Sequence, residues 1–457
     1  MPAYHELTPA QKARRRRKKR KETLKVLGAL ALALLIVILG IVFAIRGIIH
    51  LFTRDRHKAQ QTTSAEVVTI DDVIAEADRL AEGYDCDAAI EKIKSYSENY
   101  QYNNKLNDAV ERYEAKKETL VPFTDIDSIT HIFFHTLIVD CSLAFNVEDK
   151  NQAAGYNQYM TTVSEFKKMM EQMYERGYVL VDLHQIASIQ TDENGNEKMV
   201  PTPIMLPEGK KPFVMSQDDV CYYYYMDGAG FATKIVIGED GMPTCEYKNP
   251  DGTVVTGDYD LVPILEHFID EHPDFSYRGA RAALAFTGYD GVLGYRTSPS
   301  SDSCTNDYSE EEVEKAKAVA ERLKECGWTL ASHSWGHQRY GAIEYEKMVE
   351  DADKWEKEVE PIIGECDTII YANGNDIAGV EDYDGNPKYE YLKGLGFRYF
   401  CNVDSSRYWV QLGGDYLRQG RRNFDGYRMY YNPEMLEDCI DVSEVWDKER
   451  PAEVPPI

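Results

Sequence analysis

The spacing of hydrophobic residues changes along the chain and predicts its elements. From about position 128, short apolar runs alternate with longer stretches in which apolar residues recur every three to four positions. The short runs indicate strands and the longer stretches indicate helices. This repeated alternation predicts a parallel sheet, and the number of units favours a closed (β/α) barrel. The expected strands are 130–139, 178–183, 212–216, 282–287, 328–331, 368–372 and 397–401, and the expected helices are 163–176, 261–271, 309–326, 345–359 and 388–395.

The segment at 66–121 has only helical spacing. Its apolar residues fall on one face of each of two successive helices, separated by Gly83-Tyr84-Asp85, and a third helix ends before Pro122. The pattern indicates a helical hairpin that loosely resembles a tetratricopeptide repeat, with a stalk or spacer as the alternative. Within the barrel, turn sequences indicate inserted hairpins near 234–257, and 193–207 is a smaller polar excursion.

The first fifty residues carry the signals of a membrane anchor. Arg14–Lys21 is an unbroken run of eight basic residues, and Val26–Ile45 is twenty residues long without a charge. At about 1.5 Å per residue, such a helix spans a hydrocarbon core of roughly 30 Å. No small-residue cleavage site is present, so we expect an uncleaved single-pass helix at 26–45 in the cell membrane. Because basic flanks stay inside, 1–25 becomes a cytoplasmic tail. Everything after about residue 51, including the barrel at 128–435 and a tail at 436–457, is then expected to be extracellular.

The chain beyond residue 50 is strongly acidic. Residues 1–50 hold 11 of the 51 basic and 2 of the 78 acidic residues, which leaves a net charge of −36 for the remainder. Such a charge repels a phosphate backbone, so nucleic acid is not expected as a partner. The nine cysteines include no C-x-x-C pair, which argues against a cysteine zinc site and indicates mainly buried thiols.

Candidate chemistry follows two of the expected strands. Asp218 and Asp219 follow the run at 212–216 after one residue, and His333 and His337 come after the run at 328–331. Barrel enzymes keep their catalytic residues at strand ends. Two imidazoles four positions apart lie on one side of a helical turn, so one carboxylate completes a metal site while its neighbour stays free as a base. This arrangement indicates metal-assisted hydrolysis.

Each of these signals also has an ordinary structural interpretation. A single Asp-Asp pair more often lies in a solvated turn. A single His-x-x-x-His pair more often consists of surface residues or of hydrogen-bonded core residues. Their occurrence at the ends of two strands of one alternating pattern favours the metal site. The tyrosines at 222–225 and 289–295 lie near it in sequence, and they suit sugar stacking and core packing equally well.

The residues at 130–430 resemble the NodB-homology polysaccharide deacetylases, carbohydrate esterase family four. The family's T-F-D-D-G motif corresponds to 216–220, where the Asp-Asp pair matches and the flanking residues differ; its H-S/T-x-x-H motif is matched in full at 333–337. The resemblance implies the distorted barrel of this family. It also implies that Asp218 is the catalytic base and that Asp219, His333 and His337 hold the metal.

Two other motifs of the family are altered. The R-P-P-Y-G motif corresponds to 370–374 without its Arg and second Pro; the resemblance implies substrate binding by Tyr371, Asn373 and Gly374, with the Asn373 N–H at the oxyanion. No histidine follows residue 337, where the family's general acid is expected. Permuted, membrane-anchored branches carry that histidine on a first strand reading L-M-Y-H, which 132–135 resembles. His135 is therefore the expected acid, with His184 as its rival and His131 deeper in the strand.

The resemblance implies a hydrolase of linear amide C–N bonds. It would remove N-acetyl groups from an extracellular polysaccharide containing N-acetylglucosamine, either peptidoglycan or a surface glycan. One divalent ion is the expected cofactor; two imidazoles and a carboxylate suit zinc, with cobalt, nickel or manganese as substitutes. One alternative is a degenerate fold that only binds cell-wall carbohydrate, which the missing motif arginine favours. Another is a membrane scaffold that acts through the helical segment.

Overall fold

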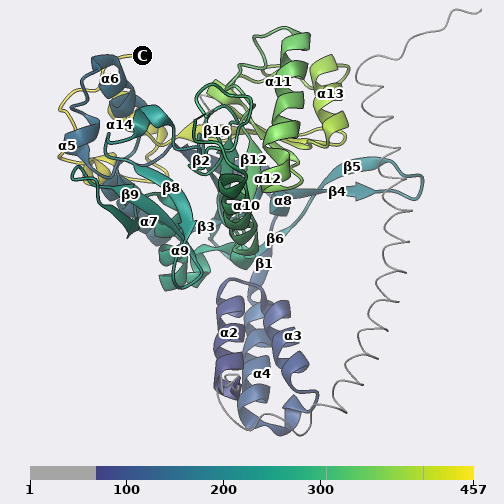
Figure 1. Cartoon of the computed structure of the whole chain (residues 1–457). Helices are drawn as coiled ribbons and strands as arrows, with labels where there is room; N and C mark the ends of the chain where they lie inside the picture. The colour runs from purple at the N-terminus through teal and green to yellow at the C-terminus, as the bar shows by residue number, and fades with distance from the viewer. Residues whose placement is uncertain (1–67, 305, 405) are drawn as a thin grey trace, which may run out of the picture.

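The computed structural model describes residues 68–457, apart from positions 305 and 405 (Figure 1). The basic run at 14–21 and the expected membrane helix at 26–45 lie outside the described residues. In the part that is described, no helix combines the length and the apolar character needed to cross a membrane.

Seven parallel strands close into a barrel, which confirms the predicted (β/α) barrel. Around the ring, β7 pairs with β11, then β12, β13, β14, β16 and β2 follow, and β2 pairs again with β7. A further strand, β3 (Tyr178–Leu180), pairs with the start of β7 outside the ring. Strand β2, the first ring strand in the sequence, therefore lies between β16, the last one, and β7. The ring strands are β2 (Thr130–Phe134), β7 (Lys211–Gln217), β11 (Ala283–Phe286), β12 (Thr329–Ser332), β13 (Thr368–Ile370), β14 (Tyr399–Val403) and β16 (Leu417–Asn423).

The closing strand β16 is absent from the elements that the sequence predicts. Its sequence, LRQGRRN, has no apolar run, yet its first six residues are buried. Buried guanidinium groups are tolerated when they are paired. Arg418 contacts Asp376 at 3.0 Å, and Arg422 contacts Asp438 at 2.9 Å. A single short antiparallel strand, β15 (Val410–Leu412), pairs beside it.

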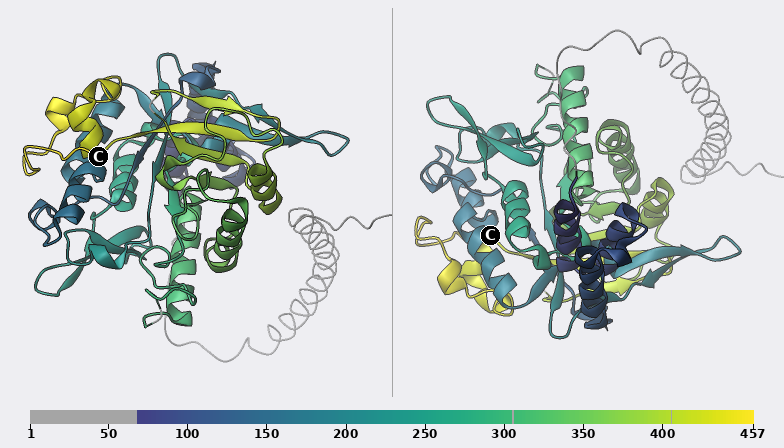
Figure 2. Two further views of the ribbon diagram at one scale, coloured as in Figure 1. Left: turned by 90° about the horizontal axis from the view of Figure 1, so that it is seen from above. Right: turned by 90° about the horizontal axis from the view of Figure 1, so that it is seen from below.

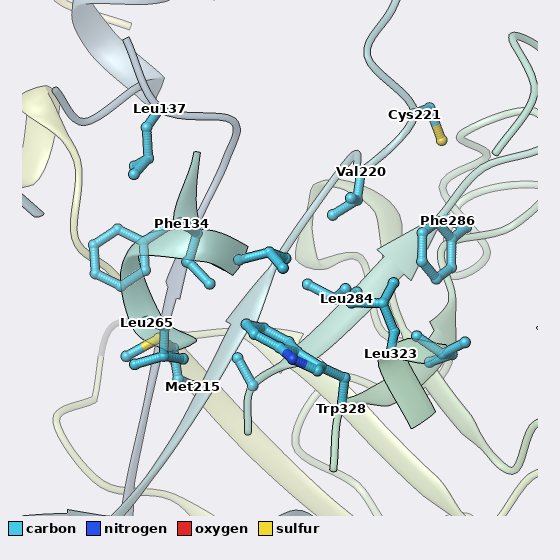
Figure 3. Close-up of a cluster of buried hydrophobic side chains, with 14 of the residues drawn as sticks. Phe134, Leu137, Met215, Val220, Cys221, Leu265, Leu284, Phe286, Leu323 and Trp328 are labelled. Carbon is cyan, nitrogen blue, oxygen red and sulfur yellow. The ribbon is translucent and has the colours of Figure 1, made fainter. Parts of the chain in front are cut away.

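Helices cover the outer face of the barrel. Strand residues such as Phe134, Met215 and Leu284 pack against Leu265 of α9 and Leu323 of α10 (Figure 3). Each large apolar side chain buried in this way contributes about 1.5–3 kcal/mol. These helices begin and end close to the expected positions, and they are α7 (Val163–Glu175), α9 (Leu261–Glu271), α10 (Glu310–Glu325), α11 (Tyr345–Glu358) and α13 (Pro387–Leu395).

Three insertions surround this framework. The region at 234–257 forms an antiparallel sheet of β8 (Ala232–Ile237), β9 (Pro243–Lys248) and β10 (Val254–Gly257), and its tight turns contain Gly241 and Gly252 with positive φ. A hairpin of β4 (Ala187–Thr191) and β5 (Glu197–Pro201) projects from the barrel, where the sequence indicated only a polar excursion (Figure 1). Helix α6 (Lys150–Tyr159) was not predicted, because its apolar residues form no clear stripe.

A helical unit covers the end of the barrel at which the strands begin. It consists of α2 (Ile70–Glu82), α3 (Cys86–Tyr96) and α4 (Asn104–Glu118), and β1 (Leu120–Phe123) connects it to the barrel by pairing with β6 (Ile204–Pro207). The Arg278 N–H donates to the Gly83 carbonyl at 2.7 Å, and the Tyr84 hydroxyl donates to the Asp274 carbonyl at 2.8 Å. In the view from below, these helices lie in front of the barrel (Figure 2). The helical unit does not cover the opposite end of the barrel, where the strands finish.

The last residues and the cysteines belong to the packed structure. Within 436–457, Arg450 is 5% exposed and forms an ion pair with the buried Glu165 of α7. Short helix α15 (Val442–Val445) lies in the same segment. All nine cysteines are free thiols and all but Cys326 are buried, as expected from their spacing.

Candidate metal and catalytic site

Three of the predicted site residues converge at the end of the barrel where the strands finish. Asp219 follows β7, while His333 and His337 follow β12. The Nε2 atoms of both histidines lie 3.8 Å from Asp219 Oδ1, and the potential ligand atoms of the three residues all lie within 4.8 Å of one another. The barrel therefore brings together one carboxylate and two imidazoles from distant parts of the sequence.

His333 is oriented as a metal ligand requires. Its Nδ1 lies 2.7 Å from the Ile370 carbonyl oxygen, which can only accept, so Nδ1 carries the hydrogen and the Nε2 lone pair faces Asp219. The ring is buried, and burial lowers the pKa of His333, although Asp218 and Asp219 oppose this shift. The side chain is therefore neutral at neutral pH, which is the form that binds cations.

Backbone strain is concentrated in the same motifs. Asp219, Ser334 and His337 have φ values of 59°, 62° and 52°, in a region that residues other than glycine seldom adopt. The His337 turn is fixed by Asp351, whose carboxylate accepts from the Trp335 and Gly336 N–H groups at 2.9 and 2.8 Å. Strained residues of this kind tend to occur at functional sites, where the surrounding contacts hold them in place.

The donor set fits a divalent transition metal. Two imidazole nitrogens and one carboxylate oxygen are ligands that zinc accepts at about 2.0–2.2 Å. Burial by itself would raise the pKa of Asp219, but His337 and His333 lower it, so the carboxylate is ionised. Three protein ligands would leave an open coordination position on a bound ion, as in catalytic sites.

Asp218 is paired with an arginine that the sequence analysis did not identify. Arg421 of β16 donates from Nη1 to Asp218 Oδ1 at 2.6 Å and from Nη2 to Asp218 Oδ2 at 2.9 Å, and its side chain is fully buried. Burial alone would raise the pKa of Asp218, but the guanidinium holds it well below its ordinary value. Asp218 is therefore ionised, and its position is fixed by a two-point contact.

The Asp218–Arg421 pair continues into a polar network inside the barrel. Arg421 Nη1 also donates to Ser216 Oγ at 3.0 Å, and Ser216 Oγ lies 2.9 Å from Nε2 of His131. The other ring nitrogen of His131 lies 3.1 Å from Gln419 Oε1. Burial and the nearby arginine lower the pKa of His131 well below its usual range. His131 thus serves as a neutral interior residue, deeper in the strand than His135.

His135 lies at the same end of the barrel as the metal cluster. It follows β2, which is the neighbour of β7, and the adjacent Asp218 N–H donates to the Phe134 carbonyl at 2.8 Å. The Nδ1 atom of His135 lies 3.1 Å from the Tyr159 carbonyl oxygen, so Nδ1 carries a hydrogen and Nε2 is the atom free to exchange a proton.

The third motif forms a tight turn beside His333. Tyr371 is 1% exposed, and its hydroxyl lies 2.9 Å from that of Tyr383, so its side chain faces the core and away from a substrate. Asn373 has a φ of 55°. A Cβ on Gly374 would lie 2.3 Å from Cβ of Val403, which explains the glycine. In this turn Asn373 is exposed, whereas the Tyr371 side chain is not.

His184, the rival candidate for the acid, lies at the opposite end of the barrel. Its ring nitrogens contact Asp182 and Asp367, the latter at 3.0 Å. Asp367 directly precedes β13, and Asp182 accepts a hydrogen bond from Thr329 at the start of β12. These are the ends where strands begin. His184 therefore cannot act on a group held near Asp218.

The His184 contacts predict a pH-dependent contribution to stability. Burial by itself would lower the pKa of His184, but Asp182 and Asp367 raise it to about 10. An unfolded histidine titrates near pH 6.5. The contribution of His184 to the free energy of unfolding is therefore complete below about pH 6.5 and is lost as the pH rises toward about 10. Between about pH 6 and 10, the free energy of unfolding should fall more for the wild type than for His184→Gln. Equal losses in urea denaturation would exclude this role.

Comparisons with known proteins give only distant similarities. No protein-family model matches the chain, and no curated protein matches it significantly. Among solved structures it is similar to the Streptococcus pyogenes deacetylase PplD in complex with acetate, at 13% identity over 71% of this chain and 100% of that chain, with a TM-score of 0.35. It is also similar to a predicted polysaccharide deacetylase of Bacillus anthracis, at 12% identity over 66% of this chain and 65% of that chain, with a TM-score of 0.34. The function is therefore inferred from this chain's own residues.

Proposed function

We propose that this protein is a metal-dependent hydrolase that removes N-acetyl groups from a polysaccharide containing N-acetylglucosamine. The observation that carries the proposal is the convergence of a metal-ligand cluster, an ionised Asp218 and His135 at one end of the barrel. Asp219, His333 and His337 would hold the ion. When bound there, a divalent metal polarises an amide carbonyl and lowers the pKa of a coordinated water toward neutrality.

Asp218 is proposed to act as the general base. It lies next to Asp219 in the chain but outside the cluster, and Arg421 keeps it ionised and in place. A carboxylate in this position accepts the proton of the attacking water. The Asn373 N–H is the proposed donor to the oxyanion, because the positive φ of Asn373 turns the backbone directly after β13, beside His333.

His135 is proposed to act as the general acid. Because Nδ1 is engaged by the Tyr159 carbonyl, Nε2 delivers the proton to the leaving nitrogen, and the C–N bond breaks to give acetate and a free amine. The base and the acid come from neighbouring strands, β7 and β2, so they approach the amide from the same end of the barrel. The amine product becomes cationic, which suits the strongly acidic chain.

The location of the activity is also a proposal. Eight basic residues precede a twenty-residue uncharged span, which supports an anchor in the cell membrane with the barrel outside the cell. The natural substrate would then be peptidoglycan or another surface glycan.

An acetate-release assay tests the proposed function. Full-length protein is loaded with zinc, cobalt, nickel or manganese and incubated with peptidoglycan, poly-N-acetylglucosamine or chitin oligomers, and acetate and new amines are measured. Acetate release that depends on the added metal supports the proposal. Binding of glycan without any acetate release would instead favour a non-catalytic carbohydrate-binding protein.

Replacing His135 with alanine should lower turnover without removing the metal. We expect kcat to fall about 10²-fold, at the lower end for a general acid, because His135 is partly exposed and water can supply the proton. Metal content and KM should stay near the wild-type values. His267→Ala, at an exposed histidine bound to Asp258, is the control. Full activity of His135→Ala would remove the acid role.

A further inference from the structure

An exposed tyrosine is linked to the metal cluster through one buried tyrosine. Tyr223, which is 2% exposed, donates from its hydroxyl to Asp219 Oδ1 at 2.6 Å, and this oxygen is the one that faces both histidines. The ring of Tyr223 stacks on Tyr225 at 5.4 Å and 14°, and on Tyr289 at 5.2 Å and 12°. Tyr225 itself is 55% exposed. A flat aromatic surface therefore lies on the rim of the proposed catalytic site.

The conformation of Tyr225 is fixed by α6. Its carbonyl oxygen accepts from Gln152 Nε2 at 2.7 Å and from the Tyr156 hydroxyl at 3.4 Å. The same helix ends at Tyr159, whose carbonyl holds His135. An aromatic ring that is already held in place loses little conformational entropy when a ligand stacks on it. Helix α6 thus holds the proposed acid and the backbone of Tyr225, while stacking on Tyr223 holds the exposed ring.

The chemistry of this surface selects its ligand. The face of an aromatic ring is electron-rich, so it attracts weakly positive C–H groups presented by a flat apolar surface. Pyranose rings present such C–H faces, whereas anions are disfavoured by the strongly acidic chain. We propose that Tyr225 is a stacking platform for the sugar ring next to the one that is deacetylated, an inference that rests on the proposed function. Tyr225 would then favour polymers over single acetylated sugars.

Kinetics with substrates of two lengths test this platform. Full-length, metal-loaded wild type, Tyr225→Ala and Tyr225→Trp are compared on the pentamer of N-acetylglucosamine and on the monomer. Tyr225→Ala should raise KM for the pentamer about two- to tenfold with kcat almost unchanged, because a stacking contact acts on bound substrate and transition state alike. KM for the monomer should not change, and Tyr225→Trp should restore the pentamer KM. Tyr102→Ala, at an 88% exposed tyrosine of the helical unit, is the matched control.

Outcomes in kinetics and in direct binding would each contradict the platform, and the binding test is independent of catalysis. An unchanged pentamer KM in Tyr225→Ala, with active wild type, overturns it while leaving the deacetylase proposal intact. If the wild type releases no acetate from any glycan, the proposed function fails, and calorimetric titration with the pentamer then decides about Tyr225. Binding that weakens in Tyr225→Ala but not in Tyr102→Ala supports the platform. Equal affinity in these variants, or no binding by the wild type, rejects it.

Discussion

Replacing His337 with asparagine, or His333 with alanine, should abolish tight binding of a divalent ion and reduce acetate release to background. Each change removes one of three ligands from an open site, and the remaining two cannot retain the ion. Loss of an outer partner alone typically lowers affinity about 10–100-fold, so loss of a ligand should exceed this. Asparagine is chosen at His337 because it tolerates the φ of 52° better than other residues. Asp219→Asn should behave similarly, because it replaces a charged ligand with a neutral amide.

Metal analysis of the purified variants checks this prediction without relying on activity. Zinc content after dialysis should be near one per chain in the wild type and near zero in the variants. His184→Gln and His267→Ala, which change histidines outside the cluster, should keep the ion. Circular dichroism confirms folding, which matters most for the buried His333. A double His333→Ala, His337→Asn variant that still holds stoichiometric metal would show that the site has been assigned to the wrong residues.

The sequence predicted the barrel because its packing follows simple periodic patterns. Apolar runs such as 212–216 are buried between helices and the barrel interior, and amphipathic helices such as 261–271 cover them. The motif residues Asp219, His333 and His337 were predicted to lie together because they follow strands of one parallel sheet, whose ends meet. Their positions after these strands therefore place them together, although His333 and His337 meet through a turn with positive φ at Ser334 and His337 and not through the expected helical turn.

The residues that the sequence analysis missed are polar and buried. Strand β16 carries Arg418, Arg421 and Arg422, so hydrophobic periodicity could not reveal it. Each arginine is stabilised by a carboxylate from a distant segment, and these pairings exist only in three dimensions. The one available signal was three arginines within five positions, in a chain with an excess of acidic residues. The absence of the family's motif arginine from 370–374 favours a non-catalytic binding protein. Arg421 nevertheless supplies a guanidinium to Asp218 from another strand.

Asp218→Asn should lower kcat about 10²–10⁴-fold while the metal content stays at the wild-type level. The amide cannot accept the proton of the attacking water, and a general base accounts for rate effects of this size. Asp218 is not part of the ligand cluster, so the ion should remain. The pairing with Arg421 adds a second effect. Because the guanidinium is fully buried, loss of its charged partner should destabilise the fold by about 3–5 kcal/mol.

A double-mutant cycle separates the two effects of Asp218→Asn. Arg421→Met leaves the buried carboxylate unpaired, whereas Asp218→Asn combined with Arg421→Met removes both charges. The double variant should regain much of the stability lost in either single variant, because no buried charge is left without a partner. Its turnover should nevertheless remain as low as that of Asp218→Asn, since the proton acceptor is still missing. Recovery of turnover in the double variant, or activity of Asp218→Asn within a few-fold of the wild type, would assign the base to another residue.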